Sequence, residues 1–116
     1  MKLFILDYNG TLSTTPDPVA FVEALKARHP KSQVVLYTGQ PPDAFPLALR
    51  SVLDGIWTKP CFLPEKVDLL GNFHQVTIVD DDPWVLRATL RTFRVGKLGT
   101  EVICLEAGQI MTLLSE

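Results

Sequence analysis

This sequence has few cysteines, no long hydrophobic run and no excess of basic charge. Its two cysteines, Cys61 and Cys104, are far apart and have no paired Cys or His at metal-ligand spacing. A zinc site is therefore disfavoured, and we expect two reduced, largely buried thiols. No apolar run approaches the roughly 18 residues that span a bilayer. Only four apolar residues separate Met1-Lys2 from Asp7, too few for a secretory signal. We expect a cytoplasmic protein without membrane segments.

The charge of the chain is nearly balanced. Eleven Lys and Arg residues stand against 13 Asp and Glu, a formal net charge of -2, so no broad basic field would attract nucleic acid in general. What is present is the composition of a packed protein, with 47% hydrophobic and 21% charged residues among 116. A chain of this length should bury roughly two thirds of its unfolded surface. We expect residues 1–116 to form a single domain.

Five short apolar runs alternate with helix-like segments. The runs are nearly continuous instead of alternating, and three are rich in Val and Ile, as expected of parallel strands covered on both faces. The predicted strands are Lys2 to Leu6, Gln33 to Tyr37, Gly55 to Trp57, Gln75 to Val79 and Glu101 to Leu105. With right-handed crossovers, this alternation predicts an α/β fold, a three-layer doubly wound (Rossmann-like) parallel sheet of about five strands.

Two helices are predicted in the first half of the chain. The first spans Pro18 to Arg28, opened by Asp17 as N-cap and closed before Pro30. The second spans Asp43 to Leu53, which places Pro46 in its first turn.

The second half of the chain adds two predicted helices. A weak pattern covers Pro64 to Leu70, and a clear one runs from Pro83 to about Phe93 with Asp82 as N-cap. Trp84, just after the acidic residues, suits either the rim of a pocket or the core. The tail, residues 108–116, suits either a short strand or a helix.

A polar or charged group follows each of the first four predicted strands: a carboxylate at Asp7, a hydroxyl at Thr38, an ammonium at Lys59 and carboxylates at Asp80 and Asp81. In a doubly wound fold the carboxyl ends of the strands border the ligand crevice. Phosphoryl transfer through an aspartyl-phosphate needs this set, because a carboxylate attacks phosphorus while acids hold Mg²⁺ and the hydroxyl and ammonium bind phosphate oxygens.

Taken singly, each of these residues is better explained as a turn former or a solvated surface group. Their convergence reverses that preference, since consecutive acids at the end of a buried strand repel one another and a divalent cation relieves the repulsion. A response-regulator receiver domain uses similar residue types, but its paired acids end the first strand and its Lys ends the last.

The stretch Asp7-Tyr8-Asn9-Gly10-Thr11-Leu12 resembles the first motif of the haloacid dehalogenase-like superfamily. The later motifs are matched in order by Thr38, by Lys59 before Pro60, and by the apolar run into Asp80 and Asp81. The resemblance covers about residues 2 to 105. The short gaps at residues 8–17 and 60–74 leave no room for a cap domain, so the resemblance implies a member of the superfamily without a cap.

The resemblance implies a role for each matching residue. Asp7 would be the nucleophile, and Lys59 would orient it. Thr38, Gly39 and Lys59 would bind phosphate oxygens. Mg²⁺ would be held by Asp7, Asp81, the backbone carbonyl of Asn9 and, as a secondary ligand that can act through water, Asp80. We also expect Lys59 to lie within reach of Asp7 and to lower its pKa.

Asn9 departs from the pattern of the hydrolytic members, which generally carry a second Asp there as acid and base. The Asn amide can neither donate a proton to the leaving group nor activate water, which should lower the rate by about 10² to 10⁴. Similar Asp-Tyr-Asn-Gly-Thr stretches occur in soluble proteins resembling the phosphorylation domain of P-type ATPases, so the substitution does not by itself exclude catalysis. Two hypotheses remain: a slow Mg²⁺-dependent phosphatase or phosphotransferase, and a non-catalytic module that recognises a phosphorylated ligand or a protein.

The absence of a cap bears on the partner. An open site suits a macromolecular phosphorylated substrate, a partner subunit that acts as lid, possible in a homo-oligomer, or a small molecule bound loosely.

Overall fold

A computed structural model describes residues 1–59, 67–82, 84, 88 and 99–115 of the chain. Its centre is a five-stranded sheet in the order β3-β2-β1-β4-β5, in which every neighbouring pair is parallel. The strands are β1 (Lys2–Asp7), β2 (Ser32–Thr38), β3 (Gly55–Thr58), β4 (Gln75–Asp80) and β5 (Glu101–Glu106). All five predicted strands are present, and each continues one residue further toward its carboxyl end than predicted.

Both faces of the sheet are covered. Along β1, Phe4 and Leu6 belong to one buried cluster, whereas Leu3 and Ile5 belong to another on the opposite face. This placement follows from the alternation of side chains along a strand, and it explains why the apolar runs are nearly continuous. The parallel α/β fold predicted from the sequence is therefore confirmed, and it is compatible with a Rossmann-like arrangement.

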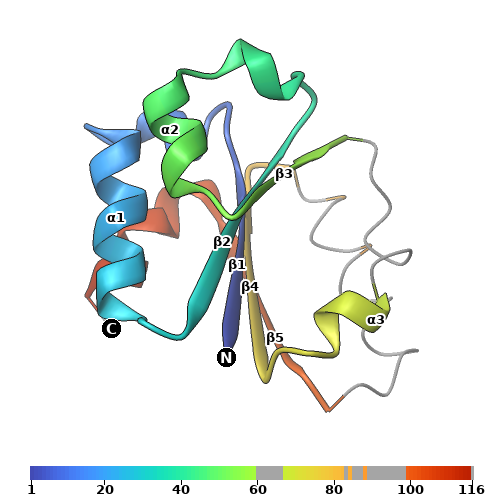
Figure 1. The fold of residues 1–116 in the computed structure, drawn as a ribbon. Coiled ribbons are helices and arrows are strands. Elements are labelled where there is room, and N and C mark those ends of the chain that lie inside the picture. Colours follow the sequence, from blue (N-terminus) through green and yellow to red (C-terminus); the bar gives the residue numbers. More distant parts are fainter. Residues whose placement is uncertain (60–66, 83, 85–87, 89–98, 116) are drawn as a thin grey trace.

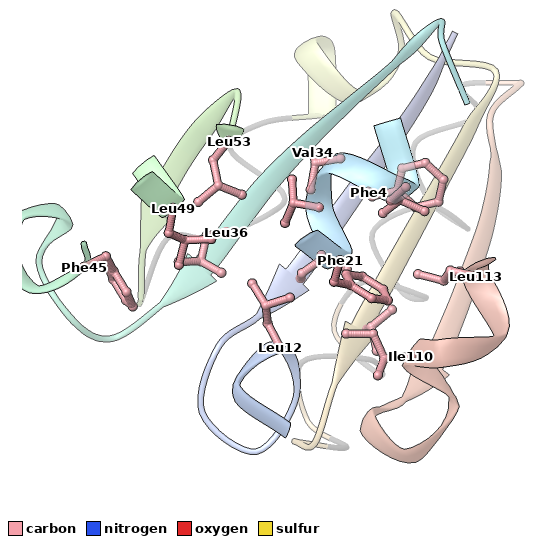
Figure 2. Close-up of a cluster of buried hydrophobic side chains, with 14 residues drawn as sticks. Phe4, Leu12, Phe21, Val34, Leu36, Phe45, Leu49, Leu53, Ile110 and Leu113 are labelled. Carbon is pink, nitrogen blue, oxygen red and sulfur yellow. The ribbon is translucent and has the colours of Figure 1, made fainter. Parts of the chain in front are cut away.

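The larger cluster lies between the sheet and three helical elements, α1 (Pro18–Arg28), α2 (Leu47–Val52) and the 3-10 helix η4 (Ala107–Leu114). Figure 1 shows these elements on one side of the sheet and α3 (Val67–Leu70) on the other. The side chains that fill the larger cluster are drawn in Figure 2. Burial of this apolar surface is the main source of stability for the layered arrangement.

Helix α1 has the bounds that the sequence predicts. The Asp17 side chain accepts a hydrogen bond from the Ala20 backbone N–H at 3.1 Å, as an N-cap should. The His29 N–H donates to the Leu25 carbonyl at 3.0 Å where the helix ends before Pro30.

The prediction of one helix from Asp43 to Leu53 is wrong. A short 3-10 helix, η2 (Pro42–Ala44), comes first, and α2 begins only at Leu47. Pro46 is the N-cap of α2 and lies outside its first turn. The cause is steric, because the ring of a proline clashes with the residue before it and disfavours the helical conformation there. Phe45, which precedes Pro46, is accordingly extended, with φ -102° and ψ 148°.

The remaining predictions are settled in part. Helix α3 ends at Leu70 as predicted, while residues 64–66 and nearly all of the helix predicted from 83 to 93 lie outside the described residues. The tail forms helix η4, which buries Ile110 and Leu113. Cys104 is half-buried in β5, and Cys61 is outside the described residues. Among the described helices, none has the length and apolar character needed to cross a bilayer.

Candidate functional site

The candidate site lies where the strand order reverses, at the carboxyl ends of β1 and β4. These two strands are neighbours although β2 and β3 separate them in sequence. Leu6 pairs with Val79, so the next residues, Asp7 and Asp80, end adjacent strands side by side. Doubly wound sheets bind ligands at this position, because the crossovers on either side of the reversal diverge and leave a crevice.

Three carboxylates meet at this point. Asp7, Asp80 and Asp81 each offer an oxygen atom, and these atoms lie within 4.8 Å of one another. Asp7 and Asp80 are buried, whereas Asp81 is exposed. An all-oxygen set of this kind fits a hard cation such as Mg²⁺ or Ca²⁺, and its open side leaves room for water or substrate oxygens. The residues are therefore able to hold a divalent metal ion.

Lys59 joins the acids across the sheet. Its ammonium lies 3.0 Å from Asp7 Oδ1 and 3.2 Å from Asp80 Oδ2. The Lys59 backbone N–H donates to the Thr38 carbonyl at 2.6 Å, which fixes the segment that follows β3. The ammonium also lies 5.0 Å from the centroid of the Tyr37 ring, a cation–π distance. The predicted proximity of Lys59 and Asp7 is confirmed.

The predicted lowering of the Asp7 pKa is wrong in its net direction. Burial raises the pKa of Asp7 and outweighs the hydrogen bond and attraction from Lys59, which lower it, and Asp81 raises it further. Burial also raises the pKa of Asp80, to about 6. The pKa of Lys59 is raised, because the carboxylates of Asp7 and Asp80 outweigh its own burial. One ammonium thus does not offset the desolvation of two carboxylates.

The turn after β1 positions Asp7 and Asp81. Gly10 has φ +75°, and a Cβ at this position would lie 2.5 Å from Asp81 Oδ2, so no other residue fits without displacing that carboxylate. The Thr11 hydroxyl donates a hydrogen bond to Asp7 Oδ2 at 3.2 Å and is fully buried. Thr11 was not among the site residues predicted from the sequence. Its place in the Gly-Thr part of the first motif was the available signal.

The uncharged candidates have different surroundings. Thr38 is buried at the end of β2, and its hydroxyl accepts a hydrogen bond from the Gln40 N–H at 3.2 Å. Tyr37 pairs with Asp7, so Thr38 lies one residue beyond Asp7 on the neighbouring strand. Asn9 and Gly39 are exposed at the same edge of the sheet. The ion pairs and carboxylate contacts thus join the four charged candidates, with Thr38, Gly39 and Asn9 on the loops beside them.

Asp82 and Trp84 continue the segment after β4. The Asp82 carboxylate accepts a hydrogen bond from the Trp84 N–H at 2.9 Å, which is the contact expected of an N-cap. The Asp82 N–H donates to Asp80 Oδ1 at 2.8 Å and so helps to orient that buried carboxylate. Trp84 is 72% exposed. Of the two alternatives for Trp84, core packing is therefore excluded.

No protein-family model matches the chain, and no curated protein matches it. Fold and geometry alone define its class: an α/β protein with a parallel sheet, whose carboxyl edge carries three clustered carboxylates and a bridging lysine.

Proposed function

We propose that this chain is a capless member of the haloacid dehalogenase-like superfamily, acting as a Mg²⁺-dependent phosphatase or phosphotransferase through an aspartyl-phosphate at Asp7. The observation that carries the proposal is the contact of one buried carboxylate with both an ammonium and two further carboxylates at the reversal of strand order. This arrangement agrees with the resemblance of the four sequence motifs to that superfamily.

In the proposed reaction, an Asp7 carboxylate oxygen forms a bond to phosphorus as the bond to the leaving oxygen breaks. The leaving oxygen then takes a proton from water, and water later hydrolyses the acyl phosphate. Asp7 is held for this attack by Thr11 on Oδ2 and by Lys59 on Oδ1. Mg²⁺ bound by Asp7, Asp80, Asp81 and the Asn9 carbonyl would neutralise charge on the phosphoryl group.

The raised pKa of Asp7 supports a requirement for the metal. A carboxyl group attacks only when ionised, and burial together with Asp81 favours its protonated form. A divalent cation beside Asp7 reverses that balance, because it attracts the ionised form more strongly than the neutral one. Binding should therefore release protons.

Asn9 supports the second candidate, a non-catalytic module that recognises a phosphorylated ligand or protein. The residue is exposed on the turn after Asp7, where a second Asp would be expected to act on the leaving group. Its amide provides neither a proton donor nor a base at neutral pH. The loss corresponds to roughly 3 to 5 kcal/mol of barrier, which slows turnover and leaves attack by Asp7 chemically feasible.

Trapping with beryllium fluoride and Mg²⁺ distinguishes the two candidates, because the fluoride occupies the place of a phosphoryl group bonded to Asp7. We expect a stoichiometric adduct, observable by fluorine NMR, that disappears on removal of Mg²⁺ and in Asp7→Asn. Asp81→Asn is the matched test of the metal site and should weaken both Mg²⁺ affinity and adduct formation. A folded wild-type protein that binds Mg²⁺ without forming the adduct would support the binding module, and unchanged Mg²⁺ affinity in Asp81→Asn would disprove the assigned metal site.

A further inference from the structure

The opposite edge of the sheet, where the strands begin, contains a cavity of about 380 Å³. In Figure 1 this edge is at the bottom, where the N end of the chain lies. The cavity is lined by Met1, Lys2, Arg28, His29, Pro30, Lys31 and His74. Three separate segments thus meet here: the start of β1, the connection from α1 to β2, and the residue before β4.

The charge around this cavity has one sign. Lys2, Arg28 and Lys31 carry full positive charges, and no Asp or Glu is among the lining residues. Among the described residues, the ion pairs are made by Lys26 and Lys59, so the three cations of the cavity have no acidic partner there. A concentration of uncompensated positive charge in a chain of net charge -2 is a local feature that would attract anions.

Backbone and side-chain contacts fix the segments around the cavity. The Lys2 N–H donates to the Lys31 carbonyl at 3.1 Å, and the His74 N–H donates to the Met1 carbonyl at 3.0 Å. The Lys2 ammonium lies 3.5 Å from His29 Nδ1. These contacts fix the backbone around the cavity and the Lys2 side chain before any ligand arrives, which lowers the entropy cost of binding.

We propose that this cavity is a second ligand site, which binds a small organic anion with at least two negative charges. Its volume lies in the range of small-molecule sites, about 300 to 1,000 Å³. Met1 and Pro30 contribute apolar side chains to the lining, so the ligand should combine its charge with an apolar or aromatic group. Three cations without acidic partners among the described residues favour a dianion, such as a phosphate monoester or an unesterified phosphonate, over a single carboxylate.

The cavity is distinct from the site around Asp7. Lys2 begins β1 and Asp7 ends it, and five steps along a strand correspond to about 17 Å. Without metal, the three carboxylates at the other edge repel an anion. A ligand added to the metal-free protein should therefore bind at the amino edge, and the outcome is independent of any activity at Asp7.

The probe is phenylphosphonate, a non-hydrolysable dianion at slightly alkaline pH, added to the full chain with EDTA at low salt. Backbone amide NMR should show saturable shifts at residues 2, 28, 29, 31 and 74, with smaller shifts at 38 and 39. The double variant Arg28→Ala/Lys31→Ala should weaken affinity about tenfold, since each exposed charge contact contributes modestly. Benzoate, which has one charge, should bind more weakly than phenylphosphonate. Added salt should weaken the binding of both ligands.

Arg50→Ala is the matched control, because Arg50 is an exposed cation on α2 that lines neither this cavity nor the Asp7 site. It should leave the affinity unchanged. The proposal is wrong if shifts do not saturate in the millimolar range, if they centre on residues 38 and 39, or if Arg50→Ala weakens binding as much as loss of Arg28 or Lys31 does. Far-ultraviolet circular dichroism of each variant shows whether the fold is retained, and the single variants Arg28→Ala and Lys31→Ala provide the same test if the double variant does not fold.

Discussion

The two ends of strand β1 lie in opposite electrostatic surroundings. At its carboxyl end, Asp7 is 5% exposed and shares one ammonium with Asp80, which is 1% exposed. At its amino end, Lys2 borders a cavity with further cations and no acid. One end thus concentrates buried negative charge, and the other concentrates accessible positive charge.

The difference shows that burial, more than the sign of the charge, decides how each end behaves. At the carboxyl edge, desolvation raises the pKa values of Asp7 and Asp80 despite a cation within hydrogen-bond distance. At the amino edge, Arg28 and Lys31 are exposed and stay hydrated, so their interactions should be weaker and sensitive to salt. This contrast is the basis for proposing a metal ion and covalent chemistry at the first edge and reversible capture of an anion at the second.

The largest effect is expected from Asn9→Asp, which adds a proton donor and base to the carboxyl edge. Hydrolysis of a simple alkyl phosphate should rise by about 10² or more, and that of a nitrophenyl phosphate by less, because its leaving group needs little protonation. Steady-state assays with and without Mg²⁺ measure both. Asp7→Asn is the control without a nucleophile. An Asn9→Asp protein that folds and binds Mg²⁺ but stays as inactive as Asp7→Asn would exclude a latent phosphatase.

The pH dependence of stability provides the second comparison, in metal-free protein. The pKa of Asp80 is about 6 in the folded protein against an ordinary 3.8, so between these values the folded state binds more protons than the unfolded state. Stability should therefore fall as pH rises through this window, by up to about 3 kcal/mol from this residue. Denaturant titrations of wild type and Asp80→Asn in EDTA isolate the effect as a difference. Equal slopes for the two proteins would show that Asp80 is not desolvated.

Gly10→Ala should perturb the carboxyl edge alone. The added Cβ meets Asp81 Oδ2, and φ +75° is unfavourable for alanine, so we expect about 1 to 2 kcal/mol of destabilisation together with weaker Mg²⁺ binding. Gly108→Ala is the matched control, because a Cβ there meets nothing within 4 Å. Thermal denaturation and calorimetric Mg²⁺ titration measure both effects. Unchanged metal affinity in a folded Gly10→Ala protein would show that Asp81 does not contribute to the metal site.

The smallest effect concerns the independence of the two edges. Arg28→Ala/Lys31→Ala should change Mg²⁺ affinity by less than about twofold at physiological salt, because the separation of about 17 Å exceeds a Debye length of about 8 Å. Any change should be a slight strengthening, since two repelling cations are removed. Calorimetry at low and physiological salt measures this. A tenfold change at physiological salt would instead reveal coupling between the edges.

Much of the fold could be predicted from the sequence, because its strands are buried on both faces and therefore are continuous apolar runs. The bounds of helix α1 could also be predicted, since Asp17 and Pro30 delimit it. The second helix is shorter than predicted because Pro46 imposes an extended conformation on Phe45. The tail was left open because its helical form depends on burial of Ile110 and Leu113 against the larger core cluster.

The site was predicted at the level of which residues meet, because parallel strands bring their carboxyl ends to one edge. The direction of the Asp7 pKa shift was not predicted, since it depends on the degree of burial, which spacing does not reveal. Thr11 was missed for a similar reason: only the three-dimensional turn shows that its hydroxyl reaches Asp7.

The bridge made by Lys59 has a mechanical consequence. Lys59 follows β3, which is an edge strand, yet its ammonium reaches past β2 to Asp7 and Asp80 on the central strands. A displacement of β3 would shift the only cation that compensates these two acids among the described residues. Both carboxylates would then favour the protonated form. Ionisation of the candidate nucleophile would therefore depend on where this edge strand lies.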